Sequence, residues 1–485
     1  MKAECRDRPR FAARGWIAAL ALAASSMGPA PGIRAEIFRA DPGWDGYRNH
    51  LVPSPAPVTR QDFGHRATHR AGGKDPGEIG GRIQRSATPA WYAKVIPTKT
   101  LEDKLTASGT FAVAGDDGGS GMLFGWFHET SHGWRTPNSL AFRIDGNGDK
   151  YWVFYEYGTR NWLTAGAGTF EGERYQTTRT EPFPADGTVH RWTMTYDPSG
   201  NDGGGTVTLG LDGKTYPLPL EPGHKADGAV FNRFGMFNQQ NTGGGLEVYF
   251  DDLVLDGTPE NFRVDPGWEG KGNSVKFEDR VRRPWNDFGF RPTAHAGGQP
   301  GELGGIIWRD EQPAYYADRV GPLTLEDELS ASGTFALSMA GSDSGVYLGW
   351  FHAADKRGKD VPEHETPQEN LLSLLIEGPS RIGHYVRPAY RTSDGAGGIP
   401  DAGPILRPDG RVHRWSIRYS PREAGGRGRV TVTLDDQALS LDLEPGHRAR
   451  GATFDRFGLF NHQSGGHMVE LYIDDLTYTT RPPGP

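Results

Sequence analysis

The chain of 485 residues is predicted to be an all-β protein, with two tandem antiparallel β-sandwich domains after a signal peptide. Three observations predict this class. The chain is rich in turn-forming residues, with 69 Gly and 36 Pro, and 11% of it is aromatic, which suits short strands joined by tight turns. A long stretch of sequence occurs twice. Within each copy the apolar residues alternate with polar ones.

The repeat sets the domain organisation. Phe38–Trp44 (FRADPGW) returns as Phe262–Trp268 (FRVDPGW), and Gly77–Gly81 (GEIGG) returns as Gly301–Gly305 (GELGG). Further pairs keep an offset of 223–225 residues, as in Gly125–His128 with Gly349–His352, His190–Trp192 with His413–Trp415, and Asp251–Leu253 with Asp474–Leu476. A period this long is a whole domain copied once. The predicted domains are 36–257 and 258–480, joined by a short linker.

The alternation inside each copy has a period of two. Leu246, Val248 and Phe250 alternate with polar neighbours, and Val469, Leu471 and Ile473 do the same in the second copy. Such alternation is typical of half-buried antiparallel strands. No convincing helix of ten or more residues follows the first 35 residues. Many short strands in a domain of this size predict a two-sheet sandwich or jelly roll.

Residues 1–35 have the pattern of a secretory signal peptide. Basic residues precede the apolar run Trp16–Ala24, and Ile33–Ala35 offers a small-residue cleavage site before Glu36. The apolar run is far shorter than the roughly 20 residues that span a bilayer, so no membrane span is expected, although an uncleaved anchor is the alternative. The predicted location is therefore the periplasm, the cell surface or the extracellular space.

Charge and cysteine content change when the signal peptide is removed. It carries six basic and two acidic residues, so the net charge shifts from −8 to −12, and it contains the single cysteine, Cys5. A secreted protein without disulfides depends on large apolar cores. A negative chain without a basic stripe is not expected to bind nucleic acid or acidic membranes. Strong binding of highly sulfated polysaccharides is not expected either, although a local basic patch could override the net charge.

Several strands of the sequence resemble a known family. Ser108–Phe111, Ser120–Phe127, His190–Trp192 and Tyr249–Leu253 are similar to strands of the concanavalin A-like (laminin-G-like) jelly-roll domains of secreted bacterial proteins, and the resemblance covers nearly all of both copies. It implies contact with an extracellular polysaccharide or glycoprotein, often with a calcium ion. Some members of the family cleave glycans, but no catalytic set can be transferred to this chain.

Adjacent aspartates end the last strand of each copy, as Asp251-Asp252 and Asp474-Asp475. Calcium prefers several oxygen ligands, so paired carboxylates beside a loop are candidate calcium ligands. Such pairs also simply end strands, and both interpretations stay open.

Two catalytic patterns occur in the sequence, but neither has the spacing that its chemistry needs. His128–His132 (HETSH) matches the H-E-x-x-H zinc pattern, but that chemistry needs a helix to bring the two histidines together. On a strand they would lie about 13 Å apart. Glu247 and Asp251 share a strand face at a similar separation, which exceeds the roughly 5–9.5 Å between paired glycosidase carboxylates.

The candidate ligand-binding residues are aromatic rings and arginines. Flat rings stack on sugar C–H faces, and guanidinium groups grip hydroxyls or carboxylates with paired donors. The alternation places Tyr151, Tyr155 and Tyr157 on one face and Trp152 on the other, so one of these faces is open to ligand. The predicted set comprises Trp134, Tyr155, Trp162, Arg191, Tyr249, Tyr385, Arg387, Arg414 and Tyr472.

These observations predict a secreted carbohydrate-binding protein. The first alternative is a glycan-cleaving enzyme, a polysaccharide lyase or glycoside hydrolase that uses the concave sheet. The second is a structural or adhesive surface protein. The sequence leaves open whether the chain is an enzyme, because no nucleophile or acid–base pair is recognisable.

Overall fold

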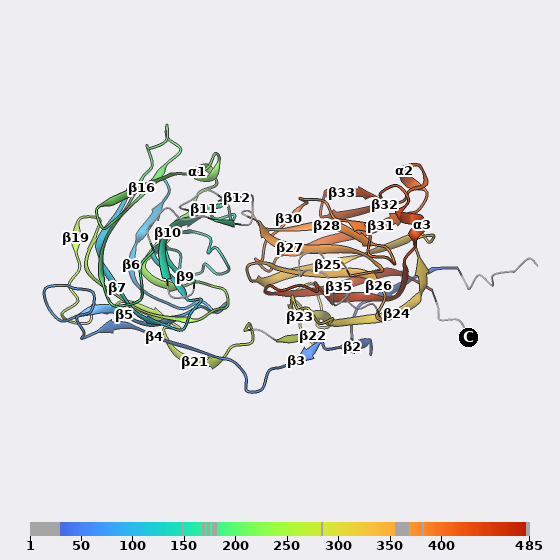
Figure 1. Ribbon diagram of the computed structural model, residues 1–485, viewed down its shortest axis with the longest axis horizontal. Coiled ribbons are helices and arrows are strands. Elements are labelled where there is room, and N and C mark those ends of the chain that lie inside the picture. The colour runs from blue at the N-terminus through green and yellow to red at the C-terminus, as the bar shows by residue number, and fades with distance from the viewer. Residues whose placement is uncertain are drawn as a thin grey trace, which may run out of the picture.

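A computed structural model describes residues 30–147, 150–166, 170–171, 175–176, 182–282, 285–354, 368–380 and 383–481. The chain forms two antiparallel β-sandwiches that lie side by side (Figure 1). Sandwich 1 is built mainly on residues 58–278 and sandwich 2 mainly on residues 286–480, each with a larger and a smaller sheet. The predicted all-β sandwich class is confirmed.

The strands of sandwich 1 are given in spatial order. Its larger sheet contains β16 (Lys214–Pro219), β15 (Thr206–Leu211), β14 (Val189–Asp197), β7 (Leu105–Asp116), β18 (Gly245–Leu255), β5 (Glu78–Gln84), β4 (Val58–Arg66) and β21 (Ser274–Glu278), and β19 (Thr258–Pro259) pairs with β18. Its smaller sheet contains β11 (Thr164–Gly166), β10 (Lys150–Gly158), β9 (Ser139–Asn147), β8 (Gly121–Phe127), β17 (Val230–Asn238), β6 (Trp91–Thr100) and β20 (Glu269–Lys271). A separate ribbon pairs β12 (Phe170–Glu171) with β13 (Tyr175–Gln176).

Sandwich 2 repeats this arrangement. Its larger sheet contains β3 (His50–Leu51), β22 (Asn286–Arg291), β23 (Glu302–Trp308), β35 (Met468–Thr480), β25 (Leu329–Ala340), β31 (Val412–Ser420), β32 (Arg429–Leu434) and β33 (Gln437–Asp442), and β1 (Gly32–Glu36) pairs with β35. Its smaller sheet contains β2 (Asp45–Tyr47), β24 (Tyr315–Thr324), β34 (Thr453–Asn461), β26 (Ser344–Phe351), β27 (Leu371–Ser380), β28 (Gly383–Arg391) and β29 (Gly397–Gly398), and β30 (Ile405–Leu406) pairs with β28. The helices in the described residues are single turns, α1 (His224–Asp227), α2 (Glu423–Gly426) and α3 (His447–Arg450).

The core of each sandwich lies between its two sheets. In sandwich 1 the inward rings of Phe124 and Phe250 stack at 4.1 Å between centroids, and Trp192 packs edge-on against Phe124. In sandwich 2 Phe457 stacks on Tyr478 at 4.4 Å. These residues come from the alternating strands of the sequence, so the period of two directs one face of every strand into the core.

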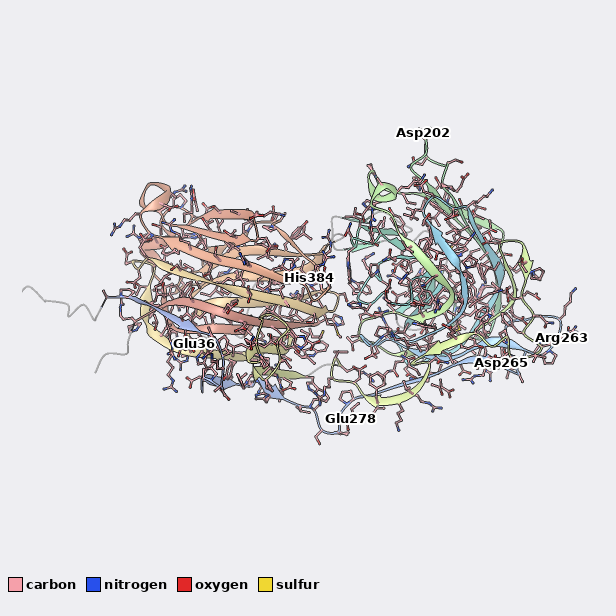
Figure 2. All side chains as sticks on the ribbon, turned by 180° about the vertical axis from the view of Figure 1, so that it is seen from behind. Glu36, Asp202, Arg263, Asp265, Glu278 and His384 are labelled. Atoms are coloured by element: carbon pink, nitrogen blue, oxygen red, sulfur yellow. The ribbon has the colours of Figure 1, made fainter. Side chains whose placement is uncertain are left out.

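The two sandwiches exchange their first segments. β1, β2 and β3, from the first copy of the repeat, pair with β35, β24 and β22 of sandwich 2. β19, β20 and β21, from the start of the second copy, pair with β18, β6 and β4 of sandwich 1. Figure 2 shows Glu36 on sandwich 2, and Arg263 and Asp265 on sandwich 1. The sheets therefore divide the chain differently from the repeat boundaries 36–257 and 258–480.

Both exchanged segments dock in the same way. Phe38 and Trp44 are buried in sandwich 2, where Trp44 stacks on Tyr316 and the Tyr316 hydroxyl donates to Asp41 (2.8 Å). Phe262 and Trp268 occupy the same place in sandwich 1, with Tyr92 and Asp265 as the corresponding pair. The repeated FRxDPGW motif is thus the part of each copy that completes the other sandwich.

The GEIGG and GELGG motifs serve this docking. A Cβ at Gly301 would overlap the carbonyl oxygen of Phe38, and a Cβ at Gly77 would overlap that of Phe262. Both glycines also have positive φ, +117° and +125°, which other residues rarely adopt. Glycine is therefore required at both positions for two independent reasons.

The described end of the predicted signal peptide takes part in the fold. Residues 1–29 lie outside the described residues, but 32–35 belong to β1. Arg34 forms an ion pair with the buried carboxylate of Asp318 (3.1 Å), which also accepts a hydrogen bond from Tyr478. Cleavage after Ala35 would remove this pair and most of β1. In the described part of the chain, no helix is long and apolar enough to cross a membrane.

An apolar cluster joins the two sandwiches. Ala87 of sandwich 1 packs with Val281, Trp285, Trp308 and Met468. Beside it, the carboxylate of Asp279 accepts hydrogen bonds from Thr59 (2.6 Å) and Ser86 (2.9 Å). These contacts tie the segment that connects the two sandwiches to sandwich 1.

The exchange of segments predicts which sandwich a mutation in a docking segment destabilises. Trp44→Ala should destabilise sandwich 2 by about 3–5 kcal/mol, because it removes a buried indole, and amide hydrogen exchange should accelerate in β24 and β35. Trp268→Ala is the matched control and should accelerate exchange in β5, β6 and β18. Faster exchange within residues 58–255 for Trp44→Ala would show that the segment docks on its own copy instead.

Candidate functional site

The strand β10 carries aromatic rings on both of its faces. Tyr151, Tyr155 and Tyr157 point into the core of sandwich 1 and are buried. Trp152 and Phe154 alternate with them, lie on the outer face of the smaller sheet, and are half-buried. The sequence-based selection of Tyr155 is therefore wrong: its side chain is 1% exposed and belongs to the core. The open face of β10 is the one that carries Trp152.

Two predicted tryptophans lie at one end of this outer face. Trp134 is in the connection between β8 and β9, and Trp162 is in the connection between β10 and β11; both are half-buried. The ring of Trp162 packs directly on Gly133, where no side chain is in the way. We call Trp134, Trp152, Phe154 and Trp162 the aromatic strip.

Charged groups alternate across the same face. Arg143 forms an ion pair with Glu156 (3.0 Å) and its guanidinium lies 4.6 Å from the centre of the Phe154 ring. Arg135 lies over the Trp134 ring and 3.9 Å from Glu156. Arg143 and Glu156 are nearly buried, at 4% and 6% exposure. The pairing keeps both side chains in fixed positions beside the rings, because each buried charge needs its partner.

This arrangement suits a ligand with alternating apolar and polar edges. The rings present flat apolar surface, and cation–π contacts fix their orientation. Guanidinium and carboxylate groups next to them can donate to and accept from hydroxyl groups. A sugar chain combines these two requirements.

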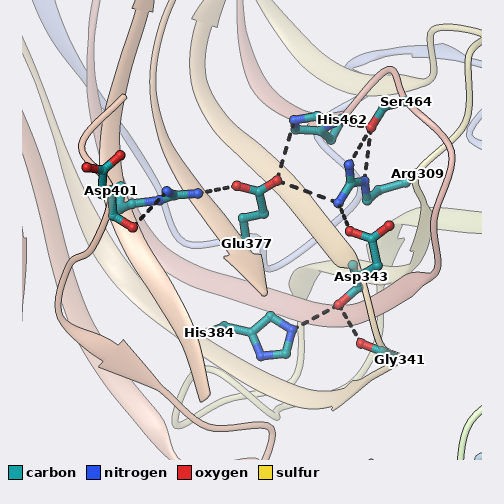
Figure 3. Close-up of polar contacts among 10 residues, drawn as sticks. Arg309, Gly341, Asp343, Glu377, His384, Asp401, His462 and Ser464 are labelled. Atoms are coloured by element: carbon teal, nitrogen blue, oxygen red, sulfur yellow. Dashed lines mark hydrogen bonds and ion pairs between the residues drawn. The ribbon is translucent and has the colours of Figure 1, made fainter. Parts of the chain in front are cut away.

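Sandwich 2 carries a different cluster at the corresponding place (Figure 3). Glu377 of β27 pairs with Arg387 of β28 and lies 3.5 Å from Arg309 and 3.9 Å from His462. Arg309 also pairs with Asp343 (2.7 Å). The predicted residues Tyr385 and Arg387 do lie together here, with Arg387 over the Tyr385 ring. Both are mostly buried, at 8% and 6% exposure.

A buried histidine lies at the inner edge of this cluster. His384 Nε2 is 2.9 Å from Ser344 Oγ, and burial lowers the pKa of His384 to about 4. The corresponding pair in sandwich 1 is Ser120 with the hydroxyl of Tyr151 (2.7 Å). His384 therefore fills the place of a core tyrosine and is neutral at pH 7.

The remaining predicted ligand residues lie on the larger sheets. Arg191 and Arg414 are exposed, on β14 and β31. Tyr249 is capped by Arg70 and donates to Glu247 (2.6 Å). Tyr472 stacks with His295 and donates to Glu470 (2.6 Å). None of these four is brought together with the aromatic strip.

The predicted metal ligands sit beneath a loop on the outer face of each larger sheet. Asp251 and Asp474 lie under Gly73 and Gly297, whereas Asp252 and Asp475 are exposed on the following residue. Neighbouring Glu78 and Glu302 anchor these loops by accepting backbone N–H groups, among them those of Ala71 (2.8 Å) and Ala296 (2.7 Å). Within the described ranges, no three His, Cys, Asp or Glu side chains are grouped as a metal site would need. This holds for His128–His132 as well.

The chain and its fold were compared with known proteins. No family model matches the chain, and no curated protein matches it. Solved structures do match. The chain is similar to domains LG4-5 of the mouse laminin alpha1 chain, with 12% identity over 89% of this chain and 100% of that one, at a TM-score of 0.25. It is also similar to the carbohydrate recognition domain of Emp47p, with 13% identity over 41% and 90% of the two chains and a TM-score of 0.24. Peanut lectin has 11% identity over 41% and 94%, at 0.24.

The Asp474 carboxyl predicts a pH dependence of stability. Burial, together with the negative charges of Asp475 and Glu302, raises the pKa of this carboxyl to about 6, although the backbone N–H of Asp475 partly opposes the shift. The folded protein therefore holds a proton that the unfolded chain releases near pH 4, so this group lowers stability as pH rises from about 4 to about 6. Asp474→Asn should raise the free energy of unfolding by about 1–3 kcal/mol at pH 7 and leave it nearly unchanged at pH 4.

Urea denaturation at the two pH values measures this difference. Asp436→Asn, at an exposed carboxylate in the turn between β32 and β33, is the control and should have no such pH dependence. An equal change at both pH values for Asp474→Asn would mean that the carboxyl is ionised throughout.

Proposed function

We propose that the protein is a secreted carbohydrate-binding protein that holds an extracellular glycan along the aromatic strip of sandwich 1. The observation that carries this proposal is a set of four half-buried rings, two on the outer face of β10 and two in the adjoining connections, beside the Arg135–Glu156–Arg143 ion pairs. Rings left partly open in a water-soluble fold have an apolar surface to offer a ligand. Arg135, the half-buried member of this ion-pair network, supplies the polar contacts that give a sugar its orientation.

A glycan array followed by titration tests the proposal. Trp152→Ala and Trp134→Ala should each weaken binding of the selected glycan about 10-fold, equivalent to about 1.4 kcal/mol. Tyr47→Ala removes an exposed ring from sandwich 2 and should leave the affinity unchanged. A blank array, or equal losses for all three variants, would refute the proposal.

The cluster in sandwich 2 favours a second candidate function, glycan cleavage. Its Glu377, His462, Arg387 and Tyr385 converge on one sheet face, and carboxylate, imidazole and phenol groups supply acids and bases. We give it second place because Glu377 is held by Arg387 and is 8% exposed.

Product analysis separates the two candidates. The wild-type protein and Glu377→Gln are incubated with the glycan that binds, and reducing ends and unsaturated products are measured. Products that disappear with Glu377→Gln would establish cleavage. Binding without products would leave the aromatic strip as the functional site.

A further inference from the structure

A second open surface lies on sandwich 1, away from the aromatic strip. A groove with a volume of about 610 Å³ runs along β4 and β5 near the connection to sandwich 2. Arg60, Arg82 and Arg282 line it together with Gln84 and Asp117. We propose that this groove binds an anionic sugar chain, one that carries carboxylate or sulfate groups.

The charges of the groove are unbalanced. Asp117 is the only acidic residue in the lining, and it is engaged by Arg82 through both guanidinium nitrogens. Arg60 contacts Asp62 with one nitrogen (3.0 Å). Arg282 donates to the carbonyl of Val58 (2.9 Å), and its charge acts on Asp117, the same carboxylate that Arg82 engages. The lining therefore keeps an excess of positive charge in a chain of net charge −8.

The repeat provides an internal comparison. Arg60, Arg82 and Gln84 correspond in register to Trp285, Ile306 and Trp308 of sandwich 2. Those three apolar residues belong to, or pack against, the cluster between the sandwiches. In sandwich 2 this position is buried against Ala87 and Val281, whereas in sandwich 1 it is open and lined by arginines. Only sandwich 1 therefore presents this position to a ligand.

The shape and chemistry of the groove select the ligand class. Its floor includes Gly118, Gly119, Gly243 and Gly244, and a Cβ at Gly118 or Gly119 would meet open space. Open glycine backbone leaves room for a sugar ring, while arginine binds planar or tetrahedral anions with paired donors. No aromatic ring lines the groove, so it lacks the stacking surface that single-stranded nucleic acids use.

The experiment compares charge-matched double variants of the full chain. Binding of polygalacturonate, chondroitin sulfate, dextran and a DNA duplex is titrated at low and physiological salt. We expect the wild type to bind a uronate-bearing or a sulfate-bearing polymer, and Arg60→Ala with Arg282→Ala to weaken that binding at least 10-fold. Arg411→Ala with Arg418→Ala removes the same charge from exposed sites on sandwich 2 and should change the affinity less than twofold.

Each outcome decides the proposal. Preference for polygalacturonate identifies a carboxylate ligand, and preference for chondroitin sulfate, which carries both carboxylate and sulfate groups, shows that sulfate adds to the affinity. Equal losses for both double variants, DNA binding as tight as that of either polymer, or no binding of either polymer would overturn it. Trp152→Ala should leave binding of the anionic polymer intact, so failure of this proposal and failure of the aromatic strip can be distinguished.

Discussion

The reciprocal docking of the two FRxDPGW segments is the constraint on which both sandwiches depend. Each segment inserts a phenylalanine and a tryptophan into the core formed by the other copy, and each requires a glycine without a Cβ opposite its backbone. Neither copy of the repeat supplies all the strands of one sandwich. The two bodies are consequently joined by strand pairing and core packing as well as by the covalent connection, and the apolar cluster around Trp285 and Trp308 adds to this.

The two copies keep the residues that dock the exchanged segments and differ most on the outer faces of the smaller sheets. Residues that fill the core or dock the exchanged segments recur, as with Tyr92 and Tyr316. The outer faces of the smaller sheets differ between the copies. Phe154 of sandwich 1 corresponds to Arg387 of sandwich 2, and Arg143 corresponds to Leu375. A duplicated fold can keep its architecture while each outer face acquires its own chemistry. The candidate sites lie where the copies differ.

The alternation of apolar and polar residues predicted the features that depend on neighbouring residues alone. Alternation identified the strands and placed Trp152 opposite Tyr151 and Tyr155 on β10, and the structure confirms that division. It could not say which face was open, so Tyr155 was selected in error. The exchange was not predictable, because both copies carry the same docking motif and either body could accept either segment. The pairing of Glu377 with Arg387 also depends on the register between β27 and β28, which a single sequence does not contain.

The exchange has a consequence for how the protein is made. A ribosome releases the chain from its N-terminus, so residues 32–51 emerge first, yet their partners extend to Thr480. The first segment to be synthesised must therefore wait, unpaired, until almost the whole chain has followed it. Sandwich 1, in contrast, can close once residue 278 has emerged. Sandwich 1 is thus completed by a segment synthesised directly after it. Sandwich 2 is completed by a segment synthesised long before its own strands.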